Sequence, residues 1–323
     1  MQNIFYPLVL KPVIKDYIWG GNKLINEFRF DSDSPSAAEA WVLAAHKNGT
    51  NIVQNGVFKG SPLNEVLDLW AKQPTQSKAF SQSPFPLLIK IIDAAEKLSI
   101  QVHPNNEYAL KYENELGKTE MWYVIDADEG ATLVYGFNRD ISKEEFRNRI
   151  INNTIEESLN FVKVNKGDVF FINPGTVHAI GKGIVIAEIQ QNSNTTYRVS
   201  DYGRIGADGK PRELHIEKAL EVAKTEKSAI NNSHVTEEFD YGSVTELCDC
   251  EFFQAKLLKL AGKNNINSDE DFLSILVIEG FITIKSSGET IKAKKGDSIL
   301  FPANFDFEIE GNADLIMSKS KSE

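Results

Sequence analysis

The sequence is poor in several residue types, and each scarcity excludes a class of protein. Its 323 residues include two cysteines, Cys248 and Cys250, too few for a disulfide-stapled secreted domain and in keeping with a reducing compartment. No apolar run approaches the roughly 18–20 residues that a membrane span needs. The N-terminal segment has no basic leader and carries Pro7 and Lys11 within its apolar part, which makes it a poor signal peptide. We therefore expect a cytoplasmic protein with no membrane partner.

Basic residues are also scarce relative to acidic ones. The 35 lysines and arginines against 46 aspartates and glutamates give a net charge of −11. A nucleic-acid-binding protein normally carries a basic stripe, and none is visible, so we expect no nucleic-acid partner. A hydrophobic content of 41% is ordinary for a globular protein. The length allows two modest domains or one large β unit.

Most of the sequence consists of short apolar, β-branched or aromatic runs separated by Gly, Asn, Asp and Pro. Such a pattern predicts many short strands and favours a β-sandwich or barrel. Four segments predict helices, each from a cap or an apolar stripe. They are 61–70, with Ser61 as N-cap before Pro62; 105–117, ending at Gly117; 142–151, with a capping box of Ser142 and Glu145; and 212–224.

An internal repeat links the two halves of the chain. The segment "VNKGDVFFINPGTVHAI" (164–180) resembles "AKKGDSILFPANFDFEI" (293–309). Both contain Lys-Gly-Asp, an apolar run and a proline, and the fourth residue after that proline is His178 in the first copy and Asp306 in the second. Lys-Gly-Asp before an apolar run is typical of a turn that leads into a strand, which predicts two related β units. The polar segment 227–240 is the expected boundary between them.

Two histidines stand out because each ends a strand-like run beside a proline and a turn. In "LSIQVHPNNEYAL", period-two spacing places Gln101 and His103 on one face of a strand that Pro104 ends. His178 occupies the corresponding place in the first copy of the repeat. Glu120 begins the apolar run of "GKTEMWYVID", where it is either exposed or paired with Lys118. His103, Glu120 and His178 would form a two-histidine, one-carboxylate metal site, suited to Zn²⁺ or Fe(II), with Gln101 as a possible fourth ligand.

The other three histidines look less functional. His215 lies in a helical pattern and His234 in the polar boundary segment, so we expect both at the surface. His46 follows an alanine-rich run and has no evident partner.

A second polar cluster lies in "GIVIAEIQQNSNTTYRVSDYGR". Glu188 interrupts an apolar strand, and Arg198 lies in a polar, hydroxyl-rich run. Asp201 and Arg204 are expected to form a salt bridge within a loop. A guanidinium near a metal can bind an enediolate or a phosphate through paired donors.

These motifs together resemble type I mannose-6-phosphate isomerases of the short bacterial kind. The resemblance covers about Lys11 to Arg204, with the motifs in family order. The segments that carry it are "KPVIKDYIWGGNKL", "LSIQVHPNNEYA", "GKTEMWYVI", "PGTVHAIGKG" and "EIQQNSNTTYRVSDYGR". It implies a mainly β fold, a double cupin of two jelly rolls with a small helical insertion. We accordingly divide the chain into a catalytic cupin domain with short helical segments (1–230) and a degenerate C-terminal cupin (231–323).

The resemblance also implies an enzyme with one Zn²⁺ per chain that acts on a small sugar phosphate, as a monomer or homodimer. The implied site residues are the zinc ligands Gln101, His103, Glu120 and His178; the catalytic arginine Arg198; the pocket residues Lys118 and Glu188, which we expect to carry the proton; and the substrate-binding residues Trp19 and Asn194. The implied reaction interconverts mannose 6-phosphate and fructose 6-phosphate through a cis-enediol.

One departure from the family pattern leaves alternatives open. Related sequences usually carry aspartate four residues before the arginine, where this chain has Asn194, which cannot exchange a proton as a carboxylate does. A sugar-phosphate sensor that retains its metal but does not catalyse is therefore one alternative. A cupin oxygenase that uses Fe(II) is another, because the same three ligands form its facial triad.

Overall fold

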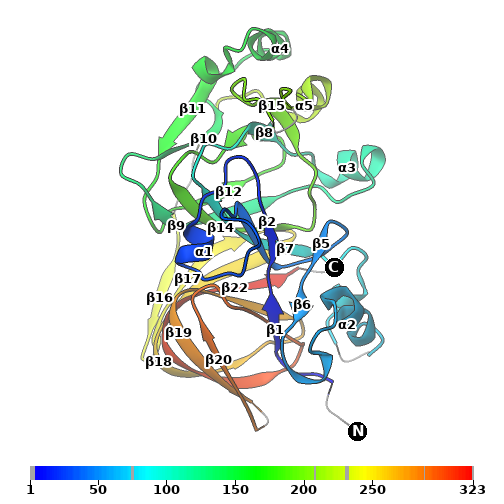
Figure 1. Ribbon diagram of the computed structural model, residues 1–323, viewed down its shortest axis with the longest axis vertical. Helices are drawn as coiled ribbons and strands as arrows, with labels where there is room; N and C mark the ends of the chain where they lie inside the picture. The colour runs from blue at the N-terminus through cyan, green and yellow to red at the C-terminus, as the bar shows by residue number, and fades with distance from the viewer. Residues whose placement is uncertain (1–3, 74–75, 207–208, 230–232, 287, 322–323) are drawn as a thin grey trace.

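The structure, a computed structural model, describes residues 4–73, 76–206, 209–229, 233–286 and 288–321. The predicted mainly β architecture is confirmed, and the few helices are short (Figure 1). Within the described part of the chain, none of the helices has the length and apolar character needed to cross a membrane.

The elements alternate irregularly along the chain. The strands are β1 (Leu8–Lys11), β2 (Val13–Lys15), β3 (Glu39–Leu43), β4 (Ala45–His46), β5 (Gly49–Thr50), β6 (Ile52–Val53), β7 (Leu87–Ala94), β8 (Ile100–Val102), β9 (Glu120–Ala127), β10 (Thr132–Phe137), β11 (Leu159–Lys163), β12 (Val169–Ile172), β13 (His178–Ala179), β14 (Ile184–Gln191), β15 (Tyr197–Ser200), β16 (Thr236–Phe239), β17 (Gly242–Asp249), β18 (Phe253–Asn267), β19 (Leu273–Ser286), β20 (Glu289–Lys294), β21 (Ser298–Phe301) and β22 (Asp306–Ser320). The helices are α1 (Lys23–Asn26), α2 (Leu63–Trp70), α3 (Asn106–Tyr112), α4 (Lys143–Ile151) and α5 (Ile216–Val222), with 3-10 turns at Gly56–Phe58, Lys78–Ser81 and Ile155–Ser158.

Two sheets of the N-terminal half enclose the core that contains the predicted metal ligands His103, Glu120 and His178. One sheet has the strand order β12-β9-β14-β7-β3-β2 and the other has the order β11-β10-β13-β8-β15. Side chains along β9 alternate between two cores: Trp122 and Val124 pack between these sheets, whereas Met121 and Tyr123 pack on the opposite side. By the same period of two, Glu120 faces the core between the sheets.

The sequence repeat is also a structural repeat. Gly167 and Gly296 both adopt a left-handed φ of +93° in the turn before a strand, β12 or β21. In each copy the following aspartate accepts a hydrogen bond from the backbone N–H three residues earlier, at 2.8 Å for both Asp168 and Asp297. The turn geometry thus supports two related β units, as the sequence predicts.

The C-terminal sheet includes strands from the start of the chain. Its order is β16-β17-β18-β22-β19-β21-β1-β6, with β20 paired to β19. Leu8 and Leu10 of β1 lie opposite Leu300 and Ser298 of β21, and β1 runs beside the C-terminal strands (Figure 1). The predicted division between residues 230 and 231 lies outside the described residues and remains a prediction, but β1 and β6 of the N-terminal half belong to the sheet of the other half.

All four predicted helices are present, but the start of α2, the end of α3 and both ends of α5, which spans 216–222 rather than 212–224, differ from the prediction. Helix α2 is preceded by Pro62 as N-cap, so Ser61 lies one residue outside the cap. Ser142 caps α4 as predicted, but the Glu145 carboxylate binds Arg139 and Arg149 rather than completing the capping box.

Helix α3 ends at Tyr112 rather than at Gly117. The chain turns at Asn114, whose φ of +52° is left-handed and incompatible with a continuing helix. Gly117 serves a different purpose: a Cβ there would lie 2.5 Å from backbone atoms of Asn105 and Asn106, so glycine permits a close backbone approach.

Candidate active site

Three predicted metal ligands meet in the core between the two sheets of the N-terminal half. The ligand atoms of His103, Glu120 and His178 all lie within 4.8 Å of one another, and the three side chains are at most 1% exposed. Glu120 begins β9, His178 begins β13, and His103 follows β8. The fold therefore brings together residues that are up to 75 positions apart in the sequence, as predicted.

Backbone carbonyls orient both imidazoles. The Nδ1 of His103 lies 2.9 Å from the Thr195 carbonyl, and the Nδ1 of His178 lies 2.8 Å from the Thr176 carbonyl. A carbonyl oxygen can only accept, so each Nδ1 carries the proton and each Nε2 is left with its lone pair. Burial lowers the pKa of both histidines, to about 4 for His178, which keeps the rings neutral and able to bind a metal.

Unpartnered atoms mark the space between these residues. The Nε2 of His178 and the Oε1 of Glu120 are buried, 3.3 Å from each other, and neither has a hydrogen-bond partner among the described residues. Burial raises the pKa of Glu120 to about 7, although the nearby Lys118 ammonium opposes the shift. Two imidazole nitrogens and one carboxylate oxygen fit a divalent cation such as Zn²⁺, whose catalytic sites commonly use three protein ligands.

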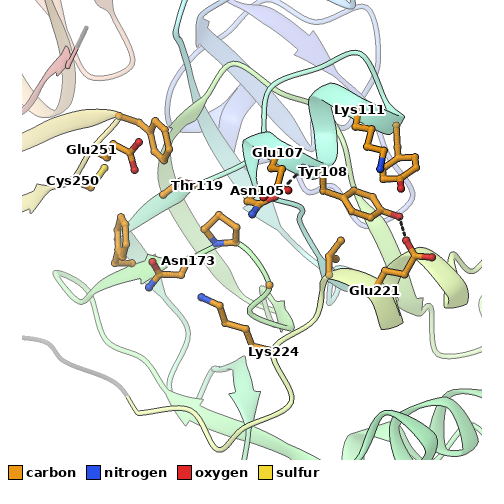
Figure 2. A pocket seen from close by; sticks show the side chains of 16 residues that line it. Asn105, Glu107, Tyr108, Lys111, Thr119, Asn173, Glu221, Lys224, Cys250 and Glu251 are labelled. Atoms are coloured by element: carbon orange, nitrogen blue, oxygen red, sulfur yellow. Dashed lines mark hydrogen bonds between the residues drawn. The ribbon is translucent and has the colours of Figure 1, made fainter. Parts of the chain in front are cut away.

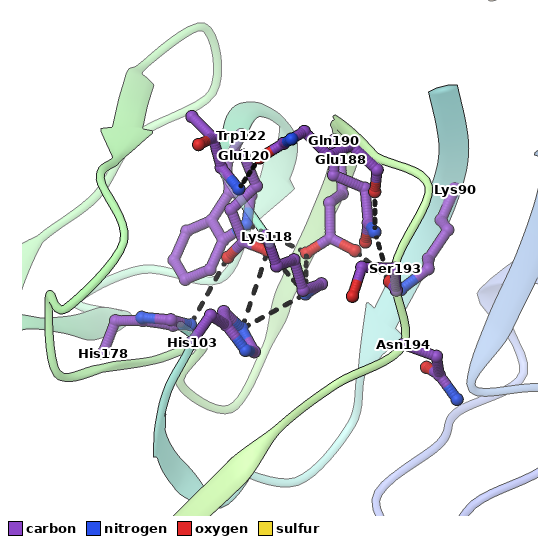
Figure 3. A network of polar contacts seen from close by, with 12 residues as sticks. Lys90, His103, Lys118, Glu120, Trp122, His178, Glu188, Gln190, Ser193 and Asn194 are labelled. Atoms are coloured by element: carbon purple, nitrogen blue, oxygen red, sulfur yellow. Dashed lines mark hydrogen bonds and ion pairs between the residues drawn. The ribbon is translucent and has the colours of Figure 1, made fainter. Parts of the chain in front are cut away.

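Lys118 joins the three-residue group to a second set of charges (Figure 3). Its Nζ lies 2.5 Å from Glu120 Oε2, 3.2 Å from His103 Nε2 and 3.9 Å from Glu188 Oε1. The predicted pairing of Lys118 with Glu120 is confirmed, but Glu120 is buried rather than exposed.

Glu188 lies between two lysines. Its Oε2 is 2.9 Å from the buried Lys90 ammonium, and its Oε1 accepts a hydrogen bond from Trp122 Nε1 at 3.1 Å. Burial raises the pKa of Glu188, but Lys118 and Lys90 outweigh burial and lower it to about 2. The two lysines therefore keep Glu188 ionised.

A cavity of about 290 Å³ opens beside these charges. It is lined by every predicted residue outside the buried three-residue group: Trp19, Gln101, Lys118, Glu188, Asn194 and Arg198. Gln101 lies opposite both His178 and Arg198 in the strand register. Among the described residues, no hydrogen bond joins its amide to the three-residue group, so its role as a ligand stays a prediction.

Arg198 lines this cavity, and its guanidinium is only partly paired with the described residues. Its Nη1 donates to the Glu213 carbonyl at 2.8 Å, whereas its buried Nε has no hydrogen-bond partner in the part of the chain that the structure describes. Burial lowers the pKa of Arg198, and the neighbouring Arg212 adds to the shift. His215 is half-buried rather than on the surface. Its ring Nδ1 accepts a hydrogen bond from the Arg198 backbone N–H at 3.0 Å, and its backbone N–H donates to the Arg198 carbonyl.

The loop after β15 is held by one carboxylate. Asp201 binds both Arg204 and Arg212, so the predicted loop salt bridge is confirmed and extended by a second arginine. Burial raises the pKa of Asp201, but the hydrogen bonds from Arg212 and Arg204 outweigh burial and lower it.

Asn194 is exposed on the cavity rim (Figure 3). Its backbone N–H donates to Glu115 Oε2 at 3.2 Å. Figure 3 shows its side chain directed away from His103 and Glu120.

Two buried charged residues of the cavity wall, Lys90 and Glu39, escaped the sequence analysis. Lys90 is 3% exposed, and Glu39, which lies 3.9 Å from its ammonium, accepts from Trp41 Nε1 at 2.7 Å. Lys90 interrupts the apolar run "LLIKIIDA" just as Glu188 interrupts "GIVIAEIQ". A single charge inside each of two apolar runs, with opposite signs, was the sequence signal that could have predicted the pairing of Lys90 with Glu188.

A larger cavity, of about 680 Å³, lies on the other side of the start of β9 (Figure 2). Its wall includes Thr119, Asn173, Lys224 and Cys250, so it lies between the N-terminal half and the end of β17. None of the three clustered ligands lines it, because Thr119 and Glu120 point to opposite faces of the strand. The smaller cavity is therefore the candidate active site.

Comparison with known proteins finds relatives that span nearly the whole chain. Residues 8–132 match the family model "Phosphomannose isomerase type I, catalytic domain", and residues 243–320 match "Mannose-6-phosphate isomerase, cupin domain". The mannose-6-phosphate isomerase ManA of Bacillus subtilis is 43% identical over 314 residues, 97% of this chain and 98% of that protein. The mannose-6-phosphate isomerase of Streptococcus mutans is 40% identical over 315 residues, 97% and 98% of the two chains.

A crystal structure of the mannose 6-phosphate isomerase from Bacillus subtilis has the same fold. It superposes with a TM-score of 0.90 at 38% identity and covers 97% of this chain and 99% of that chain. With the matching cupin model, this similarity identifies the β architecture as a cupin-type fold whose sheets do not close.

Proposed function

The chain belongs to the type I phosphomannose isomerase family, and we propose that it interconverts mannose 6-phosphate and fructose 6-phosphate through a cis-enediol. The observation that carries the proposal is the buried group of His103, Glu120 and His178 beside a cavity lined by Lys118 and Arg198. Aldose–ketose isomerisation needs a polarised carbonyl, a proton carrier and a group that stabilises negative charge, and this site offers residues for each.

The metal in this proposal is one Zn²⁺ per chain, held by His103, Glu120 and His178, with Gln101 as a possible fourth ligand. The unpartnered His178 Nε2 and Glu120 Oε1 support it, because buried polar atoms without partners are costly unless something binds them. When bound, zinc supplies a Lewis acid that polarises the substrate carbonyl.

The charged residues of the cavity have separate tasks in the proposal. The free Nε of Arg198 donates to the negative charge that develops on the enediolate oxygens. Lys118 moves the proton between C2 and C1, because it lies between the ligand group and the cavity. Glu188, which we expected to share this task, instead holds Lys118 and Lys90, since Lys90 and Trp122 engage both of its oxygens.

The wider setting of the enzyme is part of the same proposal. We infer a small sugar phosphate as its partner, Trp19 and Asn194 as substrate-binding residues, and no nucleic-acid or membrane partner. We also infer a cytoplasmic location and a monomeric or homodimeric state.

A coupled assay tests the function directly. Fructose 6-phosphate formed from mannose 6-phosphate is followed with chelator-stripped protein and again after Zn²⁺ is added. We expect turnover that zinc restores, which would mean that Asn194 is tolerated at the rim. Metal binding and tight mannose 6-phosphate binding without turnover would instead favour the sensor, and oxygen consumption with Fe(II) would favour the oxygenase.

A further inference from the structure

Glu115 is a half-buried carboxylate that the proposed reaction does not use. It follows α3, three residues before Lys118 in the sequence. Its Oε2 accepts hydrogen bonds from the Thr195 hydroxyl at 3.0 Å, the Asn194 backbone N–H at 3.2 Å and the Ser193 hydroxyl at 3.4 Å. One oxygen atom thus binds three consecutive residues of the loop between β14 and β15.

The other oxygen of Glu115 faces a basic turn. Its Oε1 lies 2.5 Å from the Lys47 ammonium and 3.9 Å from His46 Nε2. His46 Nδ1 accepts from the Asn48 backbone N–H at 3.1 Å, so the proton of the neutral ring is on Nε2 and points toward Glu115. Burial raises the pKa of Glu115, but Lys47, Thr195 and Asn194 outweigh burial and lower it, so the carboxylate stays ionised.

The loop that Glu115 binds also orients a predicted metal ligand. The Thr195 carbonyl accepts a hydrogen bond from His103 Nδ1–H, which leaves the lone pair on His103 Nε2, the nitrogen close to Lys118 and Glu120. Thr195 lies 92 residues from His103 in the sequence, so this contact exists only while the loop keeps its conformation. His178 differs, because its carbonyl partner, Thr176, is two residues away in the same turn.

We propose that Glu115 is a positioning residue for the metal site: by holding residues 193–195, it fixes the Thr195 carbonyl that orients His103, and it thereby sets the affinity for the metal. This inference rests on the proposed function. Partners that orient a metal-bound histidine typically contribute a factor of about 10–100 to metal affinity. Glu115 acts one contact further out, through Thr195.

Metal affinity, measured by competition with a chromogenic Zn²⁺ chelator, tests the proposal without reference to turnover. We expect Glu115→Ala to raise the zinc dissociation constant about tenfold, at the lower end of the range for such partners. Glu115→Gln keeps an acceptor oxygen for Thr195 and Asn194 and should recover part of the loss. Glu96→Gln, in an exposed pair with Lys182, is the matched control and should bind zinc as the wild type does.

A second variant, which keeps the Glu115 carboxylate, distinguishes loss of the contact with Thr195 from a general destabilisation caused by the Glu115 substitution. Thr195→Val removes the hydroxyl that binds Glu115 but keeps the carbonyl that binds His103, so we expect a smaller rise in the dissociation constant than in Glu115→Ala. Unchanged zinc affinity in Glu115→Ala, with the wild type binding zinc tightly, would overturn this inference and leave the proposed function standing. A wild-type chain that binds no zinc would overturn the proposed metal site itself.

Discussion

At Arg198, the buried Nε without a partner is the feature most specific to the proposed chemistry. We expect Arg198→Lys to lower kcat about 10²–10³-fold, because a point charge on a different stem cannot replace a planar donor aimed at the enediolate. Bound zinc should not change, since Arg198 is outside the ligand group. Steady-state kinetics measure kcat, and metal analysis of the same preparation measures the zinc content. The control is Arg147→Lys, at an exposed residue paired with Glu217. Equal loss of zinc and turnover would contradict the assignment.

Lys90 is a buried ammonium whose charge is stabilised by neighbouring carboxylates. Burial lowers its pKa, but Glu188 and Glu39 outweigh burial and raise it, so it stays charged. Lys90→Met removes the lysine partner of Glu39 and leaves Glu188 with Lys118 alone, 3.9 Å away, so it should destabilise the fold by about 3–5 kcal/mol. Urea unfolding measures this loss. Lys182→Met, in an exposed pair, should change stability by less than about 1 kcal/mol.

A double variant separates lost charge compensation from lost packing at Lys90. Adding Glu188→Gln to Lys90→Met removes one uncompensated charge, so the double variant should be more stable than Lys90→Met alone. If the two losses simply add, Lys90 stabilises the fold through its methylenes, and the electrostatic explanation is wrong.

The candidate site was predictable where local pattern and chemistry coincide. His103 and His178 each end a strand-like run and Glu120 begins one, so position in the run and residue type predicted that the three would meet. Lys90 and Glu115 were not predictable in the same way, because their partners, Glu188 and Thr195, are 80 or more residues away in the sequence. For Lys90 and Glu188 the one sequence signal is a single charge inside each apolar run, whereas Glu115 and Thr195 lie in polar segments that carry no such signal.

At the scale of elements, the two Lys-Gly-Asp turns allow a matched comparison. A Cβ at Gly167 would have nothing within 4 Å, whereas a Cβ at Gly296 would lie 3.0 Å from the Phe30 ring. Both glycines have φ of +93°, so Gly167→Ala should cost about 1–2 kcal/mol from backbone strain alone. Gly296→Ala should cost more, because Phe30 must also shift.

Denaturant midpoints of the two variants test this ranking. Equal losses of stability in the two variants would mean that the Phe30 ring shifts at no cost in free energy. A larger loss of stability in Gly167→Ala would contradict the shared turn geometry. The repeat was predictable because glycine and aspartate are required locally by the turn. The end of α3 was not, because Gly117 is required by a backbone contact with Asn105 and not by a helix cap.

At the scale of the whole molecule, the unexpected feature is the shared C-terminal sheet. Strand β1 pairs with β21 across 288 or more residues of sequence. Its four residues, "LVLK", resemble many other short apolar runs, so the sequence could not identify their partner. Complete unfolding of the half that contains the candidate active site would therefore remove β1 from β21 and expose an edge of the C-terminal sheet.

We therefore expect the two halves to unfold as one cooperative unit. All four tryptophans lie within the first 122 residues, so tryptophan fluorescence reports the N-terminal half, while far-UV circular dichroism also reports the long strands β18, β19 and β22. The two probes should give coincident urea transitions. Zinc at 100 times its dissociation constant should stabilise the protein by about 2.7 kcal/mol by both probes, because it binds the folded state. Glu120→Gln should abolish the zinc effect and keep the coincidence, whereas a dichroism transition that zinc does not move would show that the C-terminal sheet unfolds independently.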